Sequence, residues 1–294
     1  MTMPAHWNDS PGTRALLAAI DALVDPAHSD FVPPDERIAT IDNDGTLWCE
    51  KPIYVQVDFV VRRWHEMLTA DPSLAQAQPY KALAEQDMHW FSRVREQMPA
   101  VLKAVGDAFS GITPEQYAAQ VTAFFDEARH PLMQRPYEEM IFAPMRSLID
   151  HLRDRQFRVY ITTGGERDFV RVISERFYGI PREDVIGTTG EMEYANGVLI
   201  RAPRLVLPIN ENGGKPVHIY ARTGRRPALA IGNSDGDYEM LEFAKVGVLL
   251  RHDDDDREFA YDEGAERAQQ AAERNGWLTI SMKDDFATLF AEEP

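Results

Sequence analysis

Cysteine is almost absent from this sequence, because Cys49 is the single one among 294 residues. One cysteine excludes an intrachain disulfide and a cysteine-rich zinc site. Long apolar runs are also lacking, and no stretch of about 18 apolar residues could span a bilayer. The N-terminal segment is acidic and interrupted by proline, which does not fit a signal peptide. We therefore predict a cytoplasmic protein in which Cys49 is a small buried residue.

Basic residues are also few relative to acidic ones. The sequence has 31 Lys+Arg against 48 Asp+Glu, a net charge of −17. The average surface field repels polyanions, so nucleic acid and anionic membranes are poor partners. A small anionic substrate is still compatible, because local cations or a metal reverse the sign inside one cleft. Nothing in the sequence indicates an oligomeric state.

Hydrophobic periodicity predicts an α/β fold with a helical insertion. A short apolar strand ends at Asp42, and residues 51–136 then show helical periodicities with no convincing strand. After Tyr137, strands alternate with helices, which implies a mostly parallel sheet covered on both faces. The predicted division is a core of residues 1–50 and 137–294 with the helical insertion of residues 51–136.

The individual elements follow from the same periodicity. Helices are expected at residues 12–24, 57–68, 80–94, 101–109, 114–128, 143–155, 166–177, 218–222 and 238–243, with a closing helix to Phe290. Strands are expected at 157–161, near Val185, at 228–231, 246–250 and 277–281, with a hairpin over 191–200. Core packing is the expected role of the large side chains in the insertion, which are Trp64, Met67, Trp90, Phe91, Phe124 and Phe125.

The stretch RIATIDNDGTLW, residues 37–48, carries the first chemical signal. A buried strand that ends in Asp42 and Asp44 and then turns at Gly45 puts two acids at the C-terminal edge of the sheet, where ligands of open α/β sheets bind. Polar groups lie beside three later elements of the expected sheet. They are Thr163 with Gly164-Gly165, Lys215, and the segment 231–237.

These groups have complementary chemistry. A carboxylate can attack phosphorus to form an acyl-phosphate. A hydroxyl beside glycines at a helix start can hold phosphate oxygens, because free N–H groups favour an anion there. A lysine offsets charge on a phosphoryl group, and clustered oxygen ligands suit Mg²⁺.

The ordered set DNDGT, TTGG, GGK and GNSDGD resembles the four motifs of the haloacid dehalogenase (HAD) superfamily. The helical insertion between the first two motifs resembles the cap of its phosphoserine-phosphatase-like branch. The resemblance implies a Rossmann-like catalytic core, a helical cap domain, and a Mg²⁺-dependent phosphatase. Such an enzyme hydrolyses a small phosphorylated metabolite through an aspartyl-phosphate intermediate.

The resemblance also implies a role for each motif residue. Asp42 would be the nucleophile, and Asp44 would protonate the leaving oxygen and later activate water. Thr163, with the backbone around Gly164, would bind the phosphoryl oxygens, and Lys215 would pair with Asp42 and the phosphate. Mg²⁺ would be held by Asp42, the backbone carbonyl of Asp44, and the segment from Asn233 to Asp237.

Two positions depart from the family pattern. Asn233 stands where members often have an acid that binds the metal directly, so this site has one negative charge fewer. Asp237 is the first candidate to compensate, ahead of Asp235, because it matches the second acid of the motif. Asn43 replaces a commonly aromatic or apolar residue and should point away from the cleft.

Substrate specificity is expected to come from the cap and the loop after the first motif. Glu50 lies near the position where phosphoserine phosphatases place an acid for the substrate's amino group, so a phosphoserine-like substrate is one expectation. Trp48, Lys51 and Tyr54 are the other candidates in this loop.

Other polar residues have simpler readings. Arg201 and Arg204 are expected to be solvent-exposed, as are the run 253–256 and the helix face around His65.

Two alternative functions remain. GNSDG, residues 232–236, matches the G-x-S-x-G elbow of serine hydrolases, although the order Ser, acid, His is poorly met after Ser234. A non-catalytic HAD-like protein used for binding or regulation is the second alternative, and phosphotransferase chemistry would share the same intermediate.

Overall fold

The computed structural model of the protein describes residues 3–291, apart from the side chains of Ser92, Val94 and Arg95. Its central element is a seven-stranded sheet in the order β4-β3-β2-β1-β5-β6-β7. All neighbouring strands are parallel except β3 and β4, which form an antiparallel hairpin. The strands are β1 (Ile38–Ile41), β2 (Arg158–Glu166), β3 (Val185–Ala195), β4 (Val198–Val206), β5 (Leu229–Gly232), β6 (Val246–Arg251) and β7 (Leu278–Ser281).

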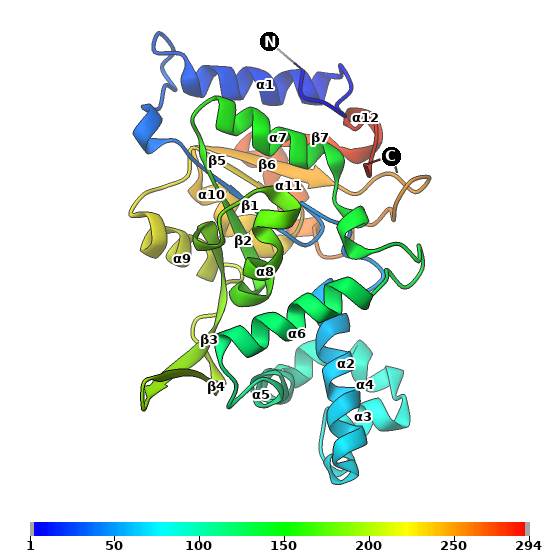
Figure 1. Ribbon diagram of the computed structural model, residues 1–294. Helices are drawn as coiled ribbons and strands as arrows, with labels where there is room; N and C mark the ends of the chain where they lie inside the picture. The colour runs from blue at the N-terminus through cyan, green and yellow to red at the C-terminus, as the bar shows by residue number, and fades with distance from the viewer. Residues whose placement is uncertain (1–2, 292–294) are drawn as a thin grey trace.

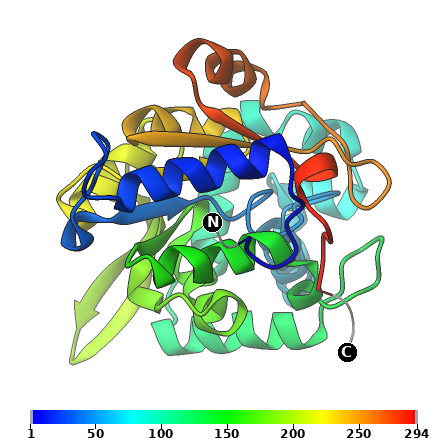
Figure 2. The same cartoon turned by 90° about the horizontal axis from the view of Figure 1, so that it is seen from above.

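Helices cover both faces of this sheet (Figure 1, Figure 2). Side chains of a strand point alternately to opposite faces, and the buried residues accordingly form two clusters. Ile41 belongs to the larger cluster with residues of α1 (Pro11–Val24), α7 (Ala143–Asp154) and α8 (Arg167–Tyr178). Ala230 belongs to the other, with residues of α9 (Gly214–Thr223), α10 (Tyr238–Phe243) and α11 (Glu266–Asn275). The predicted α/β fold is confirmed.

The helices of the insertion gather beyond one end of the sheet, at the bottom of Figure 1. They are α2 (Val55–Ala70), α3 (Tyr80–Glu85), α4 (Met88–Ser92), α5 (Met98–Ala108) and α6 (Pro114–Glu127), with the 3₁₀ turns Pro72–Gln76 and Val94–Gln97. Phe124 and Phe125 of α6 pack against Phe169 of α8, with ring centroids 6.2 and 5.3 Å apart. The insertion therefore lies against the core, while its boundaries at residues 51 and 136 stay a prediction.

The β3–β4 hairpin lies beside the insertion rather than over the sheet. Gly106 of α5 lets the two backbones meet, because a Cβ there would be 2.6 Å from the carbonyl oxygen of Pro203. The backbone of Arg201 pairs with the segment after α5, donating to Ile112 and accepting from Gly111 at 2.9 Å each. The hairpin and the helical insertion thus form one packed unit.

Two predicted segments differ from the structure near the insertion and the hairpin. The helix expected over residues 80–94 is broken, because Gln86 adopts φ +54° and Asp87 starts a new helix by accepting from the backbone N of Trp90. The strand near Val185 and the first hairpin arm are one continuous strand, β3.

Strand and helix ends differ elsewhere. Strand β2 runs to Glu166 with a register shift after Thr163, so Glu166, the first residue expected in a helix, is still extended. Helix α11 was not predicted, because its buried face is made of alanines, which signal periodicity weakly. The closing helix is only the four-residue α12 (Met282–Asp285).

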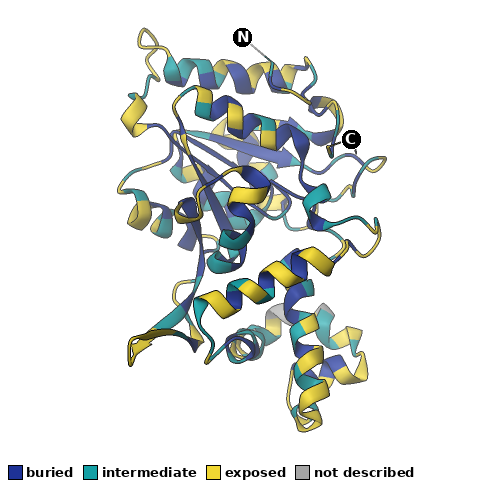
Figure 3. Cartoon of the chain, viewed as in Figure 1, coloured by how far each residue is buried: buried dark blue, intermediate teal, exposed yellow. Residues whose placement is uncertain are grey.

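Burial along the chain is shown in Figure 3. Trp64, Phe124 and Phe125 are buried as predicted, whereas Trp90 and Phe91 are only half-buried. Cys49 is buried, and burial raises the pKa of its thiol. Among residues 3–291, no helix is both long and apolar enough to cross a membrane.

Candidate active site

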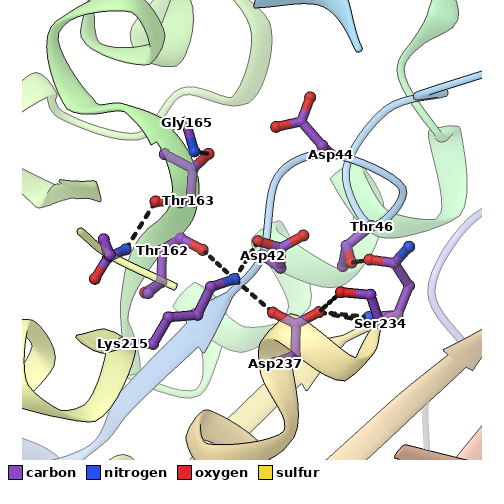
Figure 4. A network of polar contacts seen from close by, with 12 residues as sticks. Asp42, Asp44, Thr46, Thr162, Thr163, Gly165, Lys215, Ser234 and Asp237 are labelled. Atoms are coloured by element: carbon purple, nitrogen blue, oxygen red, sulfur yellow. Dashed lines mark hydrogen bonds and ion pairs between the residues drawn. The ribbon is translucent and has the colours of Figure 1, made fainter. Parts of the chain in front are cut away.

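Three neighbouring strands bring the predicted residues to one edge of the sheet (Figure 4). Asp42 directly follows β1, and β1 pairs in parallel with β2 on one side and β5 on the other. Parallel strands end at the same edge, so Thr163 of β2 and Asn233 after β5 flank Asp42. The parallel topology therefore brings the motif residues together at this edge, as expected.

Lys215 joins two carboxylates beneath this edge. It lies in the first turn of α9 and is 2% exposed. Its Nζ donates to Asp42 Oδ1 at 2.6 Å, to Asp237 Oδ1 at 2.5 Å and to the carbonyl of Thr162 at 3.2 Å (Figure 4). Burial alone would lower the pKa of Lys215, but the charges of Asp237 and Asp42 outweigh it and raise that pKa. The lysine is therefore held as a cation.

Asp42 and Asp44 sit in different surroundings. Burial and the charge of Asp237 raise the pKa of Asp42 well above its usual range, and Lys215 opposes that rise. Asp44 lies apart from the lysine network in Figure 4, and its Oδ1 accepts from Trp48 Nε1 at 2.9 Å. Burial raises the pKa of Asp44, and the Trp48 hydrogen bond opposes it. One acid is thus paired with a cation and the other with a neutral donor.

The segment from Thr163 to Gly165 forms the wall beside Asp42. Thr163 Oγ1 accepts from the backbone N of Gly165 at 3.0 Å, and the Thr163 carbonyl accepts from Asn210 Nδ2 at 2.8 Å. Glu211 packs closely on this wall, because a Cβ at Gly164 would collide with one of its carboxylate oxygens. Glu211 was missed at the sequence level, although it lies only two residues before the GGK motif.

The segment after β5 is fixed by its own hydrogen bonds. Asn233 Oδ1 accepts from Thr46 Oγ1 at 3.0 Å. Asp237 Oδ2 accepts from the backbone N of Asn233 at 3.1 Å and of Ser234 at 3.0 Å, and from Ser234 Oγ at 3.1 Å. Both oxygens of Asp237 are therefore engaged, the other one by Lys215. Asp235 faces away, accepting from the backbone N of Ala268 at 2.8 Å.

The donor set fits a divalent cation. Asp42 and Asp237 are buried carboxylates and Asp44 is partly buried, and the single charge of Lys215 does not balance three of them. Carboxylate, amide and carbonyl oxygens are the ligands that Mg²⁺ takes. Within residues 3–291, no group of three or more His, Cys, Asp or Glu side chains is arranged to hold a metal. A magnesium ion would therefore need neutral oxygens, as from Asn233 or the main chain, beside Asp42.

The loop after β1 adds a further acid. Glu50 is 5% exposed and its Oε1 accepts from the Tyr261 hydroxyl at 2.7 Å. Burial raises the pKa of Glu50 to about 7, against the lowering effect of the Tyr261 hydrogen bond. Lys51 Nζ lies 4.3 Å from the centre of the Tyr261 ring, and Tyr54 is half-exposed. Tyr261 carries no sequence signal, because it reaches this loop from 211 residues away.

Two sequence predictions near the site are wrong. Arg201 is 5% exposed rather than solvated, because it pairs with Glu166 and lies over the Tyr117 ring at 3.9 Å. Asp254 in the acidic run is 2% exposed and pairs with Arg257 instead of facing solvent, whereas Asp255 and Asp256 are exposed as predicted.

Other expectations fare better or stay untested. Arg204 is exposed as predicted. Asn43 is fully buried, and its amide has no hydrogen-bond partner among the described residues. Ser234 Oγ donates to the carboxylate of Asp237, and no hydrogen bond between this hydroxyl and a histidine is seen in the described part of the chain. The geometry therefore does not support a serine-hydrolase elbow.

The sequence matches the family model of the haloacid dehalogenase-like hydrolases over residues 39–242. This match spans more than half of the chain and includes all four motifs. The chain belongs to the haloacid dehalogenase-like hydrolase family. The resemblance read from the motifs is thereby confirmed. No curated protein matches the sequence significantly.

Solved structures share the fold of this family member. A protein of unknown function from Bordetella pertussis Tohama I is 14% identical, with a TM-score of 0.54 over 83% of this chain and 97% of that one. A functionally unknown protein from Anaerococcus prevotii is 12% identical, with a TM-score of 0.56 over the full length of both. At this identity the likeness speaks for the fold alone.

Proposed function

We propose that this HAD-family protein is a phosphatase that hydrolyses a small phosphomonoester through an aspartyl-phosphate on Asp42. The observation that carries the proposal is the pairing of Asp42 with Lys215 at 2.6 Å, while Asp44, which is partly buried, is bound by Trp48 instead. Lys215 favours the anion of Asp42, against the burial and the Asp237 charge that raise the pKa of that carboxyl. Burial also raises the pKa of Asp44, whose partner Trp48 is a neutral donor, so Asp44 can hold a proton.

The reaction then has two displacements. An oxygen of Asp42 attacks phosphorus, the bond from phosphorus to the leaving oxygen breaks, and Asp44 gives its proton to that oxygen. Water next attacks the phosphorus of the acyl-phosphate, Asp44 takes the proton from this water, and the bond to Asp42 breaks to release inorganic phosphate. Because the displacement is split into two steps, Asp42 and Asp44 act in both of them.

Charged and neutral hydrogen-bond donors around Asp42 would bind the phosphoryl group. Lys215 would offset charge on the transferring oxygens, and Thr163 with the backbone around Gly164 would bind them. Mg²⁺ would be held by Asp42, Asn233 and the main-chain carbonyl of Asp44, and when bound it supplies charge neutralisation. Asp237 would act through Lys215, since both its oxygens are engaged.

Glu50 supports a substrate that carries an ammonium group, as phosphoserine does. It is buried in the loop after β1, and the charge of Asp44 acts on its pKa, which places the two carboxylates in one neighbourhood. An ammonium group beside Glu50 would also lower the pKa of this carboxyl and keep it charged.

Phosphate release from p-nitrophenyl phosphate and a panel of phosphorylated metabolites, with Mg²⁺, tests the proposal. The wild type should release phosphate, and Asp42→Asn should lower kcat to background. The matched control is Asp235→Asn, which neutralises an acid of the same motif outside the Lys215 network. Equal rates for wild type and Asp42→Asn across the panel would favour a non-catalytic binding or regulatory protein instead.

A further inference from the structure

A buried histidine contacts the turn that follows the two proposed catalytic acids and adjoins the proposed metal site. His252 directly follows β6, which is separated from β1 by β5. It is 4% exposed, and its Nε2 lies 2.7 Å from the carbonyl oxygen of Gly45 and 3.5 Å from Asn233 Nδ2. The side chain therefore crosses the end of β5 to reach the loop after β1.

The partners of His252 determine which ring atom donates. A carbonyl oxygen only accepts, so Nε2 carries a proton and donates it to Gly45. Nδ1 faces Glu258 Oε2 at 3.1 Å, and that oxygen also accepts from the backbone N of Phe259 at 2.9 Å. The side chain of Glu258 is itself fully buried. A buried carboxylate thus holds the ring from behind while Nε2–H points at the turn.

Stacking prevents the ring from turning away. The His252 ring lies 4.3 Å from the Tyr261 ring at an interplanar angle of 23°. The Tyr261 hydroxyl donates to Glu50, so the same stack also supports the loop after β1.

Gly45 explains why this hydrogen bond is specific. Its φ is +72°, and a Cβ would collide with the amide of Asn233 and lie 2.9 Å from Glu50 Cδ. The turn is therefore confined between Asn233 and Glu50, and His252 fixes the peptide that joins Gly45 to Thr46. Thr46 in turn orients the side-chain oxygen of Asn233.

We propose that His252 is a positioning residue for the metal site. Its Nε2–H holds the Gly45 carbonyl and so aligns the main chain after Asp44 and the Asn233 oxygen. This inference rests on the cation site included in the proposed function, although not on the phosphatase reaction. It also accounts for the neutral residue at position 233. A carboxylate there would lie beside the Nε2–H of His252, which would compete with the metal for the negative charge of that carboxylate.

A pair of variants separates the two hydrogen bonds of the ring. His252→Gln places an amide nitrogen as many bonds from the backbone as Nε2, so it keeps the bond to Gly45. His252→Asn reaches only the position of Nδ1, so it keeps the bond to Glu258 and loses that to Gly45. The control is His151→Asn, which alters a buried histidine of α7 that contacts Arg155.

The readout is the affinity of each full-length variant for Mn²⁺, measured from the electron paramagnetic resonance signal of the free ion, with Tm recorded alongside. Mn²⁺ takes the same oxygen ligands as Mg²⁺. We expect His252→Asn to raise the Mn²⁺ Kd by about tenfold or more, the usual size of such an effect. His252→Gln and His151→Asn should stay near the wild-type Kd.

Three results would overturn the inference. They are equal Kd values for the Asn and Gln variants at position 252, an unchanged Kd in His252→Asn, or no Mn²⁺ binding by the wild type. Phosphate release is measured separately. If Mn²⁺ affinity follows this pattern while the wild type releases no phosphate from any substrate, the inference stands and the proposed phosphatase function fails.

Discussion

Asp42 and Asp44 are two residues apart, yet they meet different hydrogen-bond donors. Lys215 holds one and Trp48 holds the other. A charged donor stabilises an anion far more than an indole N–H does, so Lys215 opposes the rise in the pKa of Asp42 that burial and Asp237 cause, whereas Asp44 meets the weaker donor. In the proposed reaction, the division of labour between nucleophile and acid would rest on this lysine and this tryptophan.

This division predicts how Asp44→Asn affects different substrates. An amide cannot protonate a leaving oxygen, so kcat/KM for an alkyl phosphate, which depends on the steps up to the aspartyl-phosphate, should fall by about 10²–10⁴-fold. p-Nitrophenolate leaves without protonation, so kcat/KM for its phosphate ester should fall much less. Steady-state kinetics on both substrates measures the ratio. An equal loss on both would assign Asp44 to another task than proton donation.

Glu50 provides a prediction of pH dependence. Its pKa is raised from 4.5 to about 7 in the folded protein, so the native state keeps a proton that the unfolded chain has lost. The contribution of Glu50 is fully present below pH 4.5 and is lost as pH rises through 7, a change of roughly 3 kcal/mol.

Urea unfolding of the wild type and Glu50→Gln between pH 4.5 and 8, in EDTA, measures this change. Glutamine keeps an acceptor for the Tyr261 hydroxyl but has no proton to lose. The wild type should therefore lose more of its free energy of unfolding over this range than the variant does. Parallel pH profiles for the two proteins would show that Glu50 does not titrate as stated.

At the scale of elements, Glu166 connects the insertion and the hairpin to the segment Thr163 to Gly165, for which phosphate binding is proposed. Its backbone N donates to Gln56 of α2 at 2.8 Å. Its carboxylate accepts from the Tyr117 hydroxyl of α6 at 2.8 Å and pairs with Arg201 of β4. Three elements thus converge on the residue that follows Gly164-Gly165.

Removing these partners should destabilise the protein in a fixed order. Arg201→Met leaves a buried carboxylate without its cation and should cost about 3–5 kcal/mol. Tyr117→Phe removes one hydrogen bond and should cost about 1–3 kcal/mol. Arg204→Met, on the same strand but exposed, should change the free energy of unfolding far less than either of these variants. Urea denaturation at pH 7 gives the three values, and an Arg204→Met cost equal to that of Arg201→Met would refute the order.

The same elements show what the sequence could and could not predict. Asp42, Thr163 and Asn233 end up together because each is at or near the end of a buried parallel strand, and apolar runs mark such strands directly. Arg201 was misjudged because its burial depends on Tyr117, which lies on a helix packed against the hairpin. His252 was missed because its contact with Gly45 spans 207 residues. Local patterns report strands and turns, whereas these two side chains are placed by tertiary packing.

For the whole molecule, the sum of charges sets the response to divalent cations. The chain carries a net charge of −17. Buried carboxylates at the sheet edge add local repulsion that is present in the native state and absent from the unfolded chain. A cation bound at that edge relieves the repulsion only in the folded protein. Mg²⁺ should therefore raise the free energy of unfolding according to its affinity.

At a Mg²⁺ concentration of one hundred times Kd, this gain should be about 2.7 kcal/mol, which corresponds to roughly 4–5 °C in Tm for a protein of this size. Thermal unfolding with MgCl₂, and with KCl at equal ionic strength, separates the site from general screening of the acidic surface. Asp42→Asn changes the net charge by only one unit, so loose binding of Mg²⁺ to that surface would survive in it, whereas binding at the site would not. The shift should therefore be large in the wild type and small in Asp42→Asn, and equal shifts in both would place the stabilising cation elsewhere.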